Sequence, residues 1–281
     1  MTGIIDAHHH VWDLSVRDQD WITGPAMAPL RRNFTVDDLL PEAQPHAVRT
    51  TVLVQTVTVA AETPEFLAIA ERSELVAGVV GWTDLTRPDV GDRLAALRAL
   101  PGGRHLAGIR HQVQGEPDPE WLLRAEVRRG LTAVADAGLV YDLVVLEHQL
   151  PACVRAAAEL PQLTFVLDHL GKPPIAAGTL EPWATRIRAL AALPNTVCKL
   201  SGMVTEAAWD SWTVDDLAPY AATVLEAFGP ARVMFGSDWP VCTLAAPYAA
   251  VVRAARQLTA HLGEAERAEV FAGTAARVYG L

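Results

Sequence analysis

The sequence predicts a single α/β domain, a (β/α)8 barrel over residues 1–281 with extra C-terminal helices. Three observations support it: eight short apolar runs, helical spacing between successive runs, and no Gly/Ser-rich or Pro-rich linker. The length agrees, because α/β barrels of about 250 residues commonly form one domain. Runs that are apolar on both faces are typical of parallel strands covered by helices. The alternative is a doubly wound open sheet, although the glycine patterns of nucleotide-binding sheets are absent from the sequence.

The expected strands are short and rich in Val, Ile and Leu, and prolines and glycines mark several helix boundaries between them. Strands are expected at Ile4–Ala7, Thr51–Val54, Val76–Gly81, Leu106–Ile109, Val140–Val145, Leu163–Leu167, Val197–Leu200 and Val233–Phe235. Helices are expected at Pro64–Ser73, Val90–Leu100, Pro119–Ala137, Gln149–Leu160, Pro182–Leu193 and Asp215–Phe228, followed by Tyr248–His261 and Glu264–Tyr279. The irregular segment Asp13–Pro45, helical in spacing only at Val36–Ala43, is long enough to lie over the barrel mouth.

Composition and charge exclude several classes of function. The formal net charge is −10 and no basic cluster is longer than Arg128–Arg129, so nucleic acid is not an expected partner. The N-terminus has no cationic leader and no run of about 18 apolar residues occurs, so neither secretion nor a membrane span is expected. The three cysteines are widely spaced without a CxxC pair, which indicates buried thiols in a reducing, cytoplasmic compartment. Whether the chain forms a homo-oligomer stays open.

Polar side chains gather where the expected strands end, which in a barrel is the face that carries the active site. Five of the nine histidines lie at these ends. The only two lysines among 23 basic residues, Lys172 and Lys199, also lie near strand ends, through either compositional bias or a nearby site. In strand order, the polar and aromatic residues at or near these ends are Asp6, His8, His9, His10, Gln55, Trp82, Asp84, Arg110, His111, Gln112, Asp168, His169, Lys199, Ser201, Ser237 and Asp238.

Several of these residues have both a functional and a structural interpretation. His8 and His10 lie two apart on a strand, so their side chains point the same way and can hold one metal ion or one oxyanion. A chance run of histidines is the alternative, and His9 would then pack between barrel and helix. Asp238 ends an apolar strand, where a carboxylate is costly unless paired or used, and a salt bridge or a helix N-cap is its alternative role. For His169 the alternative is a core histidine bonded to a backbone carbonyl.

Five segments resemble a known group of enzymes: IDAHHHVWD, GIRHQVQGEPDPEWL, FVLDHLGKP, CKLSGM and VMFGSDWP. Together they are similar to the lactonase group of the amidohydrolase superfamily, which includes L-fucono- and L-rhamnonolactone hydrolases and the pyrone-dicarboxylate lactonase. The matches run from residue 4 to about residue 242, in the family's order and at strand ends. The resemblance implies a (β/α)8 barrel, hydrolysis at a carbonyl group, and Asp238 as the general base towards water.

The resemblance leaves open whether the site holds a metal ion. Metal-dependent amidohydrolases usually add a lysine or a histidine from strand four or five, whereas here strand five has no histidine and strand four offers Arg110, which cannot bind a metal. His8, His10 and Asp238 are still sufficient to hold one divalent ion, zinc before others, with water in the open position. The alternative is a site without metal, because an arginine in the same lumen would repel a dication and the pyrone lactonase branch is understood to work without one. His8 and His10 would then be oxyanion donors.

Applied to these residues, the resemblance implies a lactonase that opens a cyclic ester to a hydroxy acid. Asp238 takes a proton from the attacking water and returns it to the departing ring oxygen. His169 and Arg110 are the other expected catalytic groups, and Arg110 with the histidines polarises the carbonyl. Substrate binding is expected from five further residues near the strand ends: Trp12, Gln55, Trp82, His111 and Lys199.

The expected substrate is a small neutral sugar lactone, such as L-fucono- or L-rhamnonolactone. Hydrogen-bonding groups and flat apolar walls suit it, whereas a dicarboxylated pyrone needs several cationic anchors, and the strand ends supply only Arg110, Lys199 and Lys172. A pyrone-dicarboxylate-type lactonase is nevertheless the nearest alternative. A metal-dependent decarboxylase of the same superfamily and a catalytically inactive binding protein on the same barrel are the other two.

Overall fold

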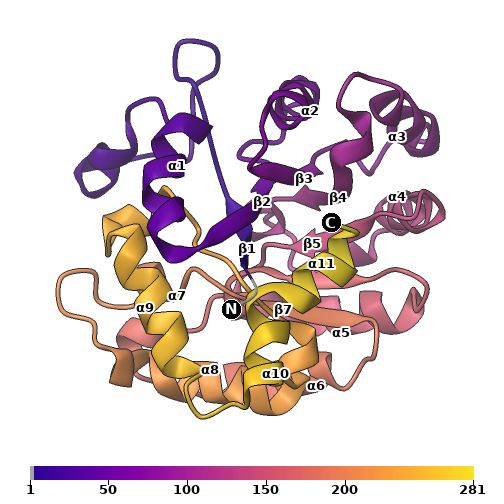
Figure 1. Cartoon of the computed structure of the whole chain (residues 1–281). Coiled ribbons are helices and arrows are strands. Elements are labelled where there is room, and N and C mark those ends of the chain that lie inside the picture. The colour runs from indigo at the N-terminus through magenta and orange to yellow at the C-terminus, as the bar shows by residue number, and fades with distance from the viewer. Residues whose placement is uncertain (1–2) are drawn as a thin grey trace.

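The structure is a computed structural model that describes residues 3–281, and it confirms the predicted barrel. Eight parallel strands pair in sequence order, β1 to β8, inside a ring of helices (Figure 1). The strands are β1 (Ile4–His9), β2 (Val48–Val54), β3 (Val76–Gly81), β4 (Leu106–His111), β5 (Val140–Leu143), β6 (Phe165–Leu167), β7 (Thr196–Leu200) and β8 (Val233–Phe235). The helices are α1 (Val36–Ala43), α2 (Glu62–Arg72), α3 (Val90–Arg98), α4 (Ala125–Asp136), α5 (Leu150–Glu159), α6 (Trp183–Ala191), α7 (Met203–Glu206), α8 (Val214–Phe228), α9 (Tyr248–Leu258), α10 (Glu264–Ala268) and α11 (Thr274–Tyr279).

The barrel closes between β8 and β1 through the loop that follows β8. The backbone N–H of Asp238 donates to His8 O at 2.8 Å, and that of His10 donates to Trp239 O at 2.7 Å. Beneath this seam, the fully buried carboxylate of Asp6 accepts from the backbone N–H of Ser237 at 2.7 Å. Burial raises the pKa of Asp6 to about 6, although hydrogen bonds from Ser237, His8 and Tyr248 favour its ionised form. The seam therefore fixes the first and last strand ends beside each other.

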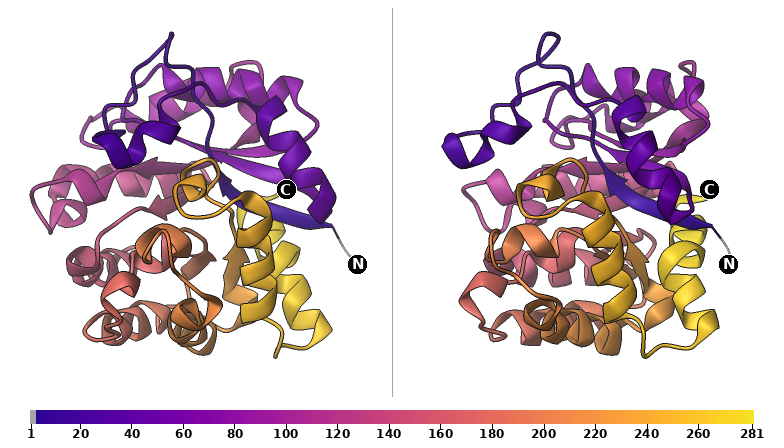
Figure 2. Two further views of the ribbon diagram at one scale, coloured as in Figure 1. Left: turned by 90° about the vertical axis from the view of Figure 1, so that its left-hand side faces the viewer. Right: turned by 60° about the vertical axis from the view of Figure 1, so that its left-hand side comes forward.

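The strands separate two apolar cores. The larger one lies between the barrel and the outer helices, and the smaller one fills the barrel itself. Side chains from α11 belong to the inner core, and Leu281 lies against Gly78 near the start of β3. The last helix therefore covers the amino-terminal end of the barrel, where both ends of the described chain lie (Figure 2).

Two predicted helices are wrong at their boundaries. The helix expected over Pro119–Ala137 begins only at α4. Before it, Trp121–Leu123 forms a short 3-10 helix, and Asp118 holds this segment by accepting from the backbone N–H of Glu120 at 3.0 Å and from Arg124 Nε at 2.9 Å. The stretch expected over Glu264–Tyr279 is divided by a π-helical turn into α10 and α11.

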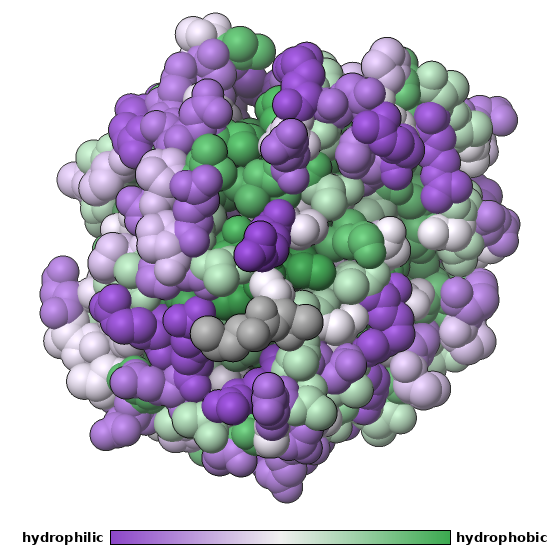
Figure 3. Space-filling model, viewed as in Figure 1, coloured by the Kyte–Doolittle hydropathy of each residue, from purple (hydrophilic) through white to green (hydrophobic). Residues whose placement is uncertain are grey.

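The predicted burial of the three thiols is confirmed, since all three cysteines are buried and free. Among residues 3–281, no helix has the length and apolar composition needed to cross a bilayer. On the face that carries the termini, apolar side chains are visible between α1 and α2 (Figure 3). A cavity of about 690 Å³ lies between the 11–37 stretch and α2, with Trp12 and Phe66 among its lining residues.

Candidate active site

A pocket of about 320 Å³ opens at the carboxyl-terminal ends of the strands. Its polar floor comes from residues at strand ends, and its walls come from the loops around the mouth. The long first loop supplies Trp21 and Met27, so the Asp13–Pro45 segment does reach the barrel mouth. The floor includes His10, Arg110, His169 and Asp238, and the walls include Trp21, Met27, Gln112, Lys172, Glu206, Trp209 and Leu244.

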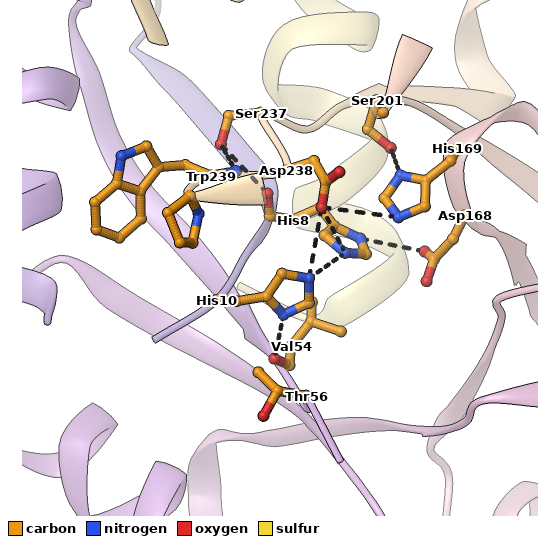
Figure 4. Close-up of polar contacts among 12 residues, drawn as sticks. His8, His10, Val54, Thr56, Asp168, His169, Ser201, Ser237, Asp238 and Trp239 are labelled. Carbon is orange, nitrogen blue, oxygen red and sulfur yellow. Dashed lines mark hydrogen bonds and ion pairs between the residues drawn. The ribbon is translucent and has the colours of Figure 1, made fainter. Parts of the chain in front are cut away.

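The structure brings together the predicted cluster of three histidines and Asp238 (Figure 4). His8 Nε2 and His10 Nε2 are 3.1 Å apart. Asp238 Oδ1 lies 3.5 Å from His10 Nε2, 3.8 Å from His8 Nε2 and 3.9 Å from His169 Nε2. All four side chains are buried, so every unpaired charge among them would be costly.

Each catalytic candidate is held by a second contact. His10 Nδ1 lies 2.7 Å from Val54 O, so this nitrogen carries a proton and Nε2 faces the cluster. His169 Nδ1 lies 2.8 Å from Ser201 Oγ. His169 and Asp238 both have left-handed backbones, with φ of 53° and 59°, a costly conformation that persists where the surrounding structure fixes it.

Burial sets the protonation of the site. It lowers the pKa of His169 to about 4, so this imidazole is neutral at neutral pH. Burial alone would raise the pKa of Asp238, but the neighbouring His169 and the hydrogen bond with His10 hold it below the ordinary value of 3.8. Asp238 is therefore an ionised carboxylate next to neutral His169, as a general base requires.

Arg110 is fixed by three neighbours below the pocket. Its Nε donates to Gln55 Oε1 at 3.1 Å and its Nη1 donates to Asp168 Oδ2 at 2.8 Å. The same Nη1 is 3.4 Å from His8 Nε2. The carboxylate of Asp168 therefore offsets the positive charge that Arg110 places next to His8.

Lys199 lies beneath His8 and is fully buried. Its Nζ is 2.6 Å from Asp142 Oδ2, 3.0 Å from Asp168 Oδ1 and 3.2 Å from His8 Nδ1. Burial raises the pKa of Asp142 to about 6, with Lys199 opposing the shift. Lys199 is not among the residues that line the pocket, so its contact with substrate stays a prediction.

The other four expected substrate ligands also lie outside the pocket lining. Trp82 Nε1 donates to His111 Nδ1 at 3.0 Å, and His111 Nε2 is 2.7 Å from Glu116 Oε1. Trp12 lines the separate cavity beside α2, and Gln55 is buried against Arg110. None of these four residues lines the pocket, and their contact with substrate likewise stays a prediction.

Sequence reasoning missed residues on both sides of the site. Asp142 lies in the strand without a histidine, and a carboxylate inside an apolar run is a signal of a buried partner. Glu206 and Trp209 lie several residues beyond the end of a strand, and Trp21 and Met27 lie in the irregular first loop. These wall residues could not be found by examining strand ends alone.

The cluster fits a zinc ion. His8, His10 and Asp238 each offer one donor atom within a small volume. Their donor atoms are 3.1, 3.5 and 3.8 Å apart, close to the roughly 3.3 Å between ligands of a tetrahedral zinc with bonds of about 2.0–2.1 Å. The backbone carbonyl behind His10 is also the kind of partner that orients zinc-binding imidazoles.

A (β/α)8 barrel whose mouth holds paired histidines and an ionised aspartate is typical of hydrolases of the amidohydrolase kind. The chain belongs to the amidohydrolase family, whose model matches residues 5–281.

Two curated relatives match almost the whole chain. It is 40% identical over 288 residues to an L-fucono-1,5-lactonase of Burkholderia multivorans, covering 99% of this chain and 96% of that protein. It is 37% identical over 285 residues to an L-fucono-1,5-lactonase of Burkholderia ambifaria, with the same coverage of 99% and 96%. A crystal structure of an amidohydrolase from Burkholderia multivorans with bound zinc is similar with a TM-score of 0.94 at 38% identity, over 100% of both chains.

Proposed function

We propose that this protein hydrolyses neutral sugar lactones of the L-fucono-1,5-lactone kind, with Asp238 activating the attacking water. The observation that carries the proposal is the buried, ionised Asp238 on the pocket floor, with Oδ1 3.5 to 3.9 Å from three imidazole nitrogens. Membership of the amidohydrolase family and two relatives named L-fucono-1,5-lactonase support hydrolysis of a cyclic ester.

The proposed reaction is general-base hydrolysis. Asp238 accepts a proton as water attacks the lactone carbonyl, and it returns that proton to the ring oxygen when the ring C–O bond breaks. Arg110 is a permanent donor that lines the pocket, so it stabilises the negative charge that develops on the carbonyl oxygen. His169, held by Ser201, orients the carboxylate of Asp238.

His8, His10 and Asp238 would hold the zinc ion. When bound there, zinc supplies Lewis acidity and lowers the pKa of water. His10 Nε2 faces the cluster because Nδ1 donates to Val54 O. This nitrogen is therefore placed to bind a metal, which requires its unprotonated form.

The charges around the site favour a neutral lactone over a dicarboxylated pyrone. Each cation near the pocket already has a carboxylate partner within 3.0 Å. The carboxylates also outnumber these cations, so the side chains alone offer a dianionic substrate no net attraction. The cations are Arg110, Lys172 and Lys199, and the carboxylates are Asp142, Asp168, Glu206 and Asp238.

A panel of neutral sugar lactones and carboxylated lactones, followed with a pH indicator, tests the proposal. The wild-type protein is expected to release acid from the neutral lactones, and Asp238→Asn is expected to lower kcat by roughly 10³-fold. Asp210→Asn, which removes an exposed carboxylate, is the matched control and should retain wild-type turnover. Failure of the wild-type protein to open any neutral sugar lactone would refute the proposal, and release of carbon dioxide would indicate the decarboxylase instead.

A further inference from the structure

The ion pair of Lys172 and Glu206 lies in the wall of the pocket. Lys172 Nζ donates to Glu206 Oε1 at 2.8 Å, and the two side chains are 23% and 24% exposed. Lys172 follows β6 and Glu206 ends α7, so the pair joins two separate segments of the mouth. Both residues line the pocket, so a bound ring would meet an ammonium whose charge Glu206 has already neutralised.

The backbone of Lys172 has little freedom to move. It is the last of four successive residues with positive φ, from His169 to Lys172, and its own φ is 52°. Its backbone N–H donates to His169 O at 2.8 Å. A non-glycine residue in this conformation is strained, and the surrounding contacts hold it there. The ammonium is therefore presented to the pocket from a fixed backbone.

The other two cations near the pocket are held more deeply. Arg110 is 3% exposed and paired with Asp168, and Lys199 is fully buried between Asp142 and Asp168. Of the lysine and arginine side chains that line the pocket, Lys172 is the more exposed. Among the side chains, Lys172 is therefore the most accessible cation for a carboxylated ligand.

We infer that Glu206 determines specificity by occupying Lys172 and so excluding carboxylated rings from the pocket. The inference rests on the proposed function, because it names the feature that restricts the lactonase to neutral substrates. Glu206 acts in two ways: it removes the positive charge that an anionic ring would need, and its own carboxylate repels such a ring. In a partly desolvated wall, both effects exceed those at an open surface.

Binding of two matched, unreactive rings tests this inference by calorimetry. Isophthalate carries two carboxylates, and benzene-1,3-dimethanol is its neutral counterpart of similar shape. Glu206→Gln keeps the size of the side chain and releases Lys172, so isophthalate should bind at least about tenfold more tightly than to the wild type. The neutral ring should bind within about twofold of wild type.

Two further variants separate the pair from general effects. In the double variant Lys172→Gln with Glu206→Gln, the gain for isophthalate should disappear, since the released ammonium is gone. Glu147→Gln is the matched control, because Glu147 pairs with Arg186 at similar exposure (26% and 31%) and does not line the pocket. It should bind isophthalate as the wild type does.

The outcomes distinguish this inference from the proposed function. Unchanged isophthalate binding in Glu206→Gln, or a gain that persists in the double variant, overturns the role of Glu206. Both measurements are independent of turnover, so they remain decisive if the wild-type protein opens no sugar lactone. Turnover of neutral lactones with unchanged isophthalate binding would retain the lactonase and reject Glu206 as its specificity determinant.

Discussion

The phenol oxygen of Tyr279, in the last helix, lies 2.8 and 3.0 Å from the two carboxylate oxygens of Asp142 inside the barrel. Asp142 in turn accepts from Lys199 Nζ at 2.6 Å, and Lys199 is 3.2 Å from His8 Nδ1. Burial raises the pKa of Tyr279 well above its ordinary value, which keeps the phenol protonated and able to donate. A series of buried polar contacts thus joins the helix that covers the amino-terminal end of the barrel to the catalytic end.

Tyr279→Phe should impair turnover although the residue is remote from the pocket. The change leaves a buried Asp142 with one donor fewer, so the free energy of unfolding should fall by about 1–3 kcal/mol in urea. Misplacement of Lys199 and His8 should lower kcat by about tenfold with little change in KM, since the pocket walls are intact. Tyr220→Phe is the control, because its phenol bonds Pro174 O and Thr179 O. Equal kcat in Tyr279→Phe and wild type would show that the contact is only structural.

The sequence was sufficient for the barrel because eight apolar runs with intervening helical spacing leave few alternative arrangements. It also indicated the cluster of His8, His10 and Asp238, since the carboxyl ends of barrel strands converge on one face. The residues of the pocket walls and the buried residues beneath the site were harder to predict. Glu206 lies on a loop helix, and Tyr279 reaches the barrel interior from the last helix, so neither position follows from strand ends.

Arg110→Lys should be far from conservative. The guanidinium contacts Gln55 through Nε and Nη2 and Asp168 through Nη1, a planar geometry that an ammonium cannot reproduce. We expect kcat/KM to fall by at least about 100-fold, corresponding to roughly 2.7 kcal/mol of transition-state stabilisation. Arg124→Lys, at an exposed pair with Asp118, should leave it unchanged. Activity near wild type in Arg110→Lys would show that the planar geometry of the guanidinium is not required.

Zinc should stabilise the folded protein through His10. After treatment with a chelator, addition of Zn²⁺ should raise the Tm of the wild type, since a ligand that binds only the folded state stabilises it. His10→Gln should abolish the shift, whereas replacement of the exposed His148 by Gln should not. Elemental analysis should find one zinc per wild-type chain. An absent Tm shift in the wild type, together with turnover unaffected by the chelator, would instead support the scheme without metal.

His9→Leu should stabilise the protein, and more so in acid. His9 is fully buried, and no group in residues 3–281 hydrogen-bonds either of its ring nitrogens. Burial lowers its pKa from 6.5 to about 3, so between these values the unfolded chain binds a proton that the folded chain does not. The contribution of His9 to the free energy of unfolding of the wild type therefore falls as the pH decreases from 6.5 towards 3. This decrease due to His9 is about 2 kcal/mol at pH 5.

Urea unfolding at pH 8 and pH 5 measures this effect, because the buried acids present in both proteins cancel in the difference. At pH 8 the free energy of unfolding of His9→Leu should exceed that of the wild type by about 1–2 kcal/mol, because the variant no longer buries two ring nitrogens without hydrogen bonds. At pH 5 the difference should be larger by about 2 kcal/mol. His261→Leu, at an exposed position, controls for loss of a histidine and should show no comparable gain in acid. An advantage of His9→Leu that is equal at both pH values would show that His9 accepts a proton equally well in the folded and unfolded chain.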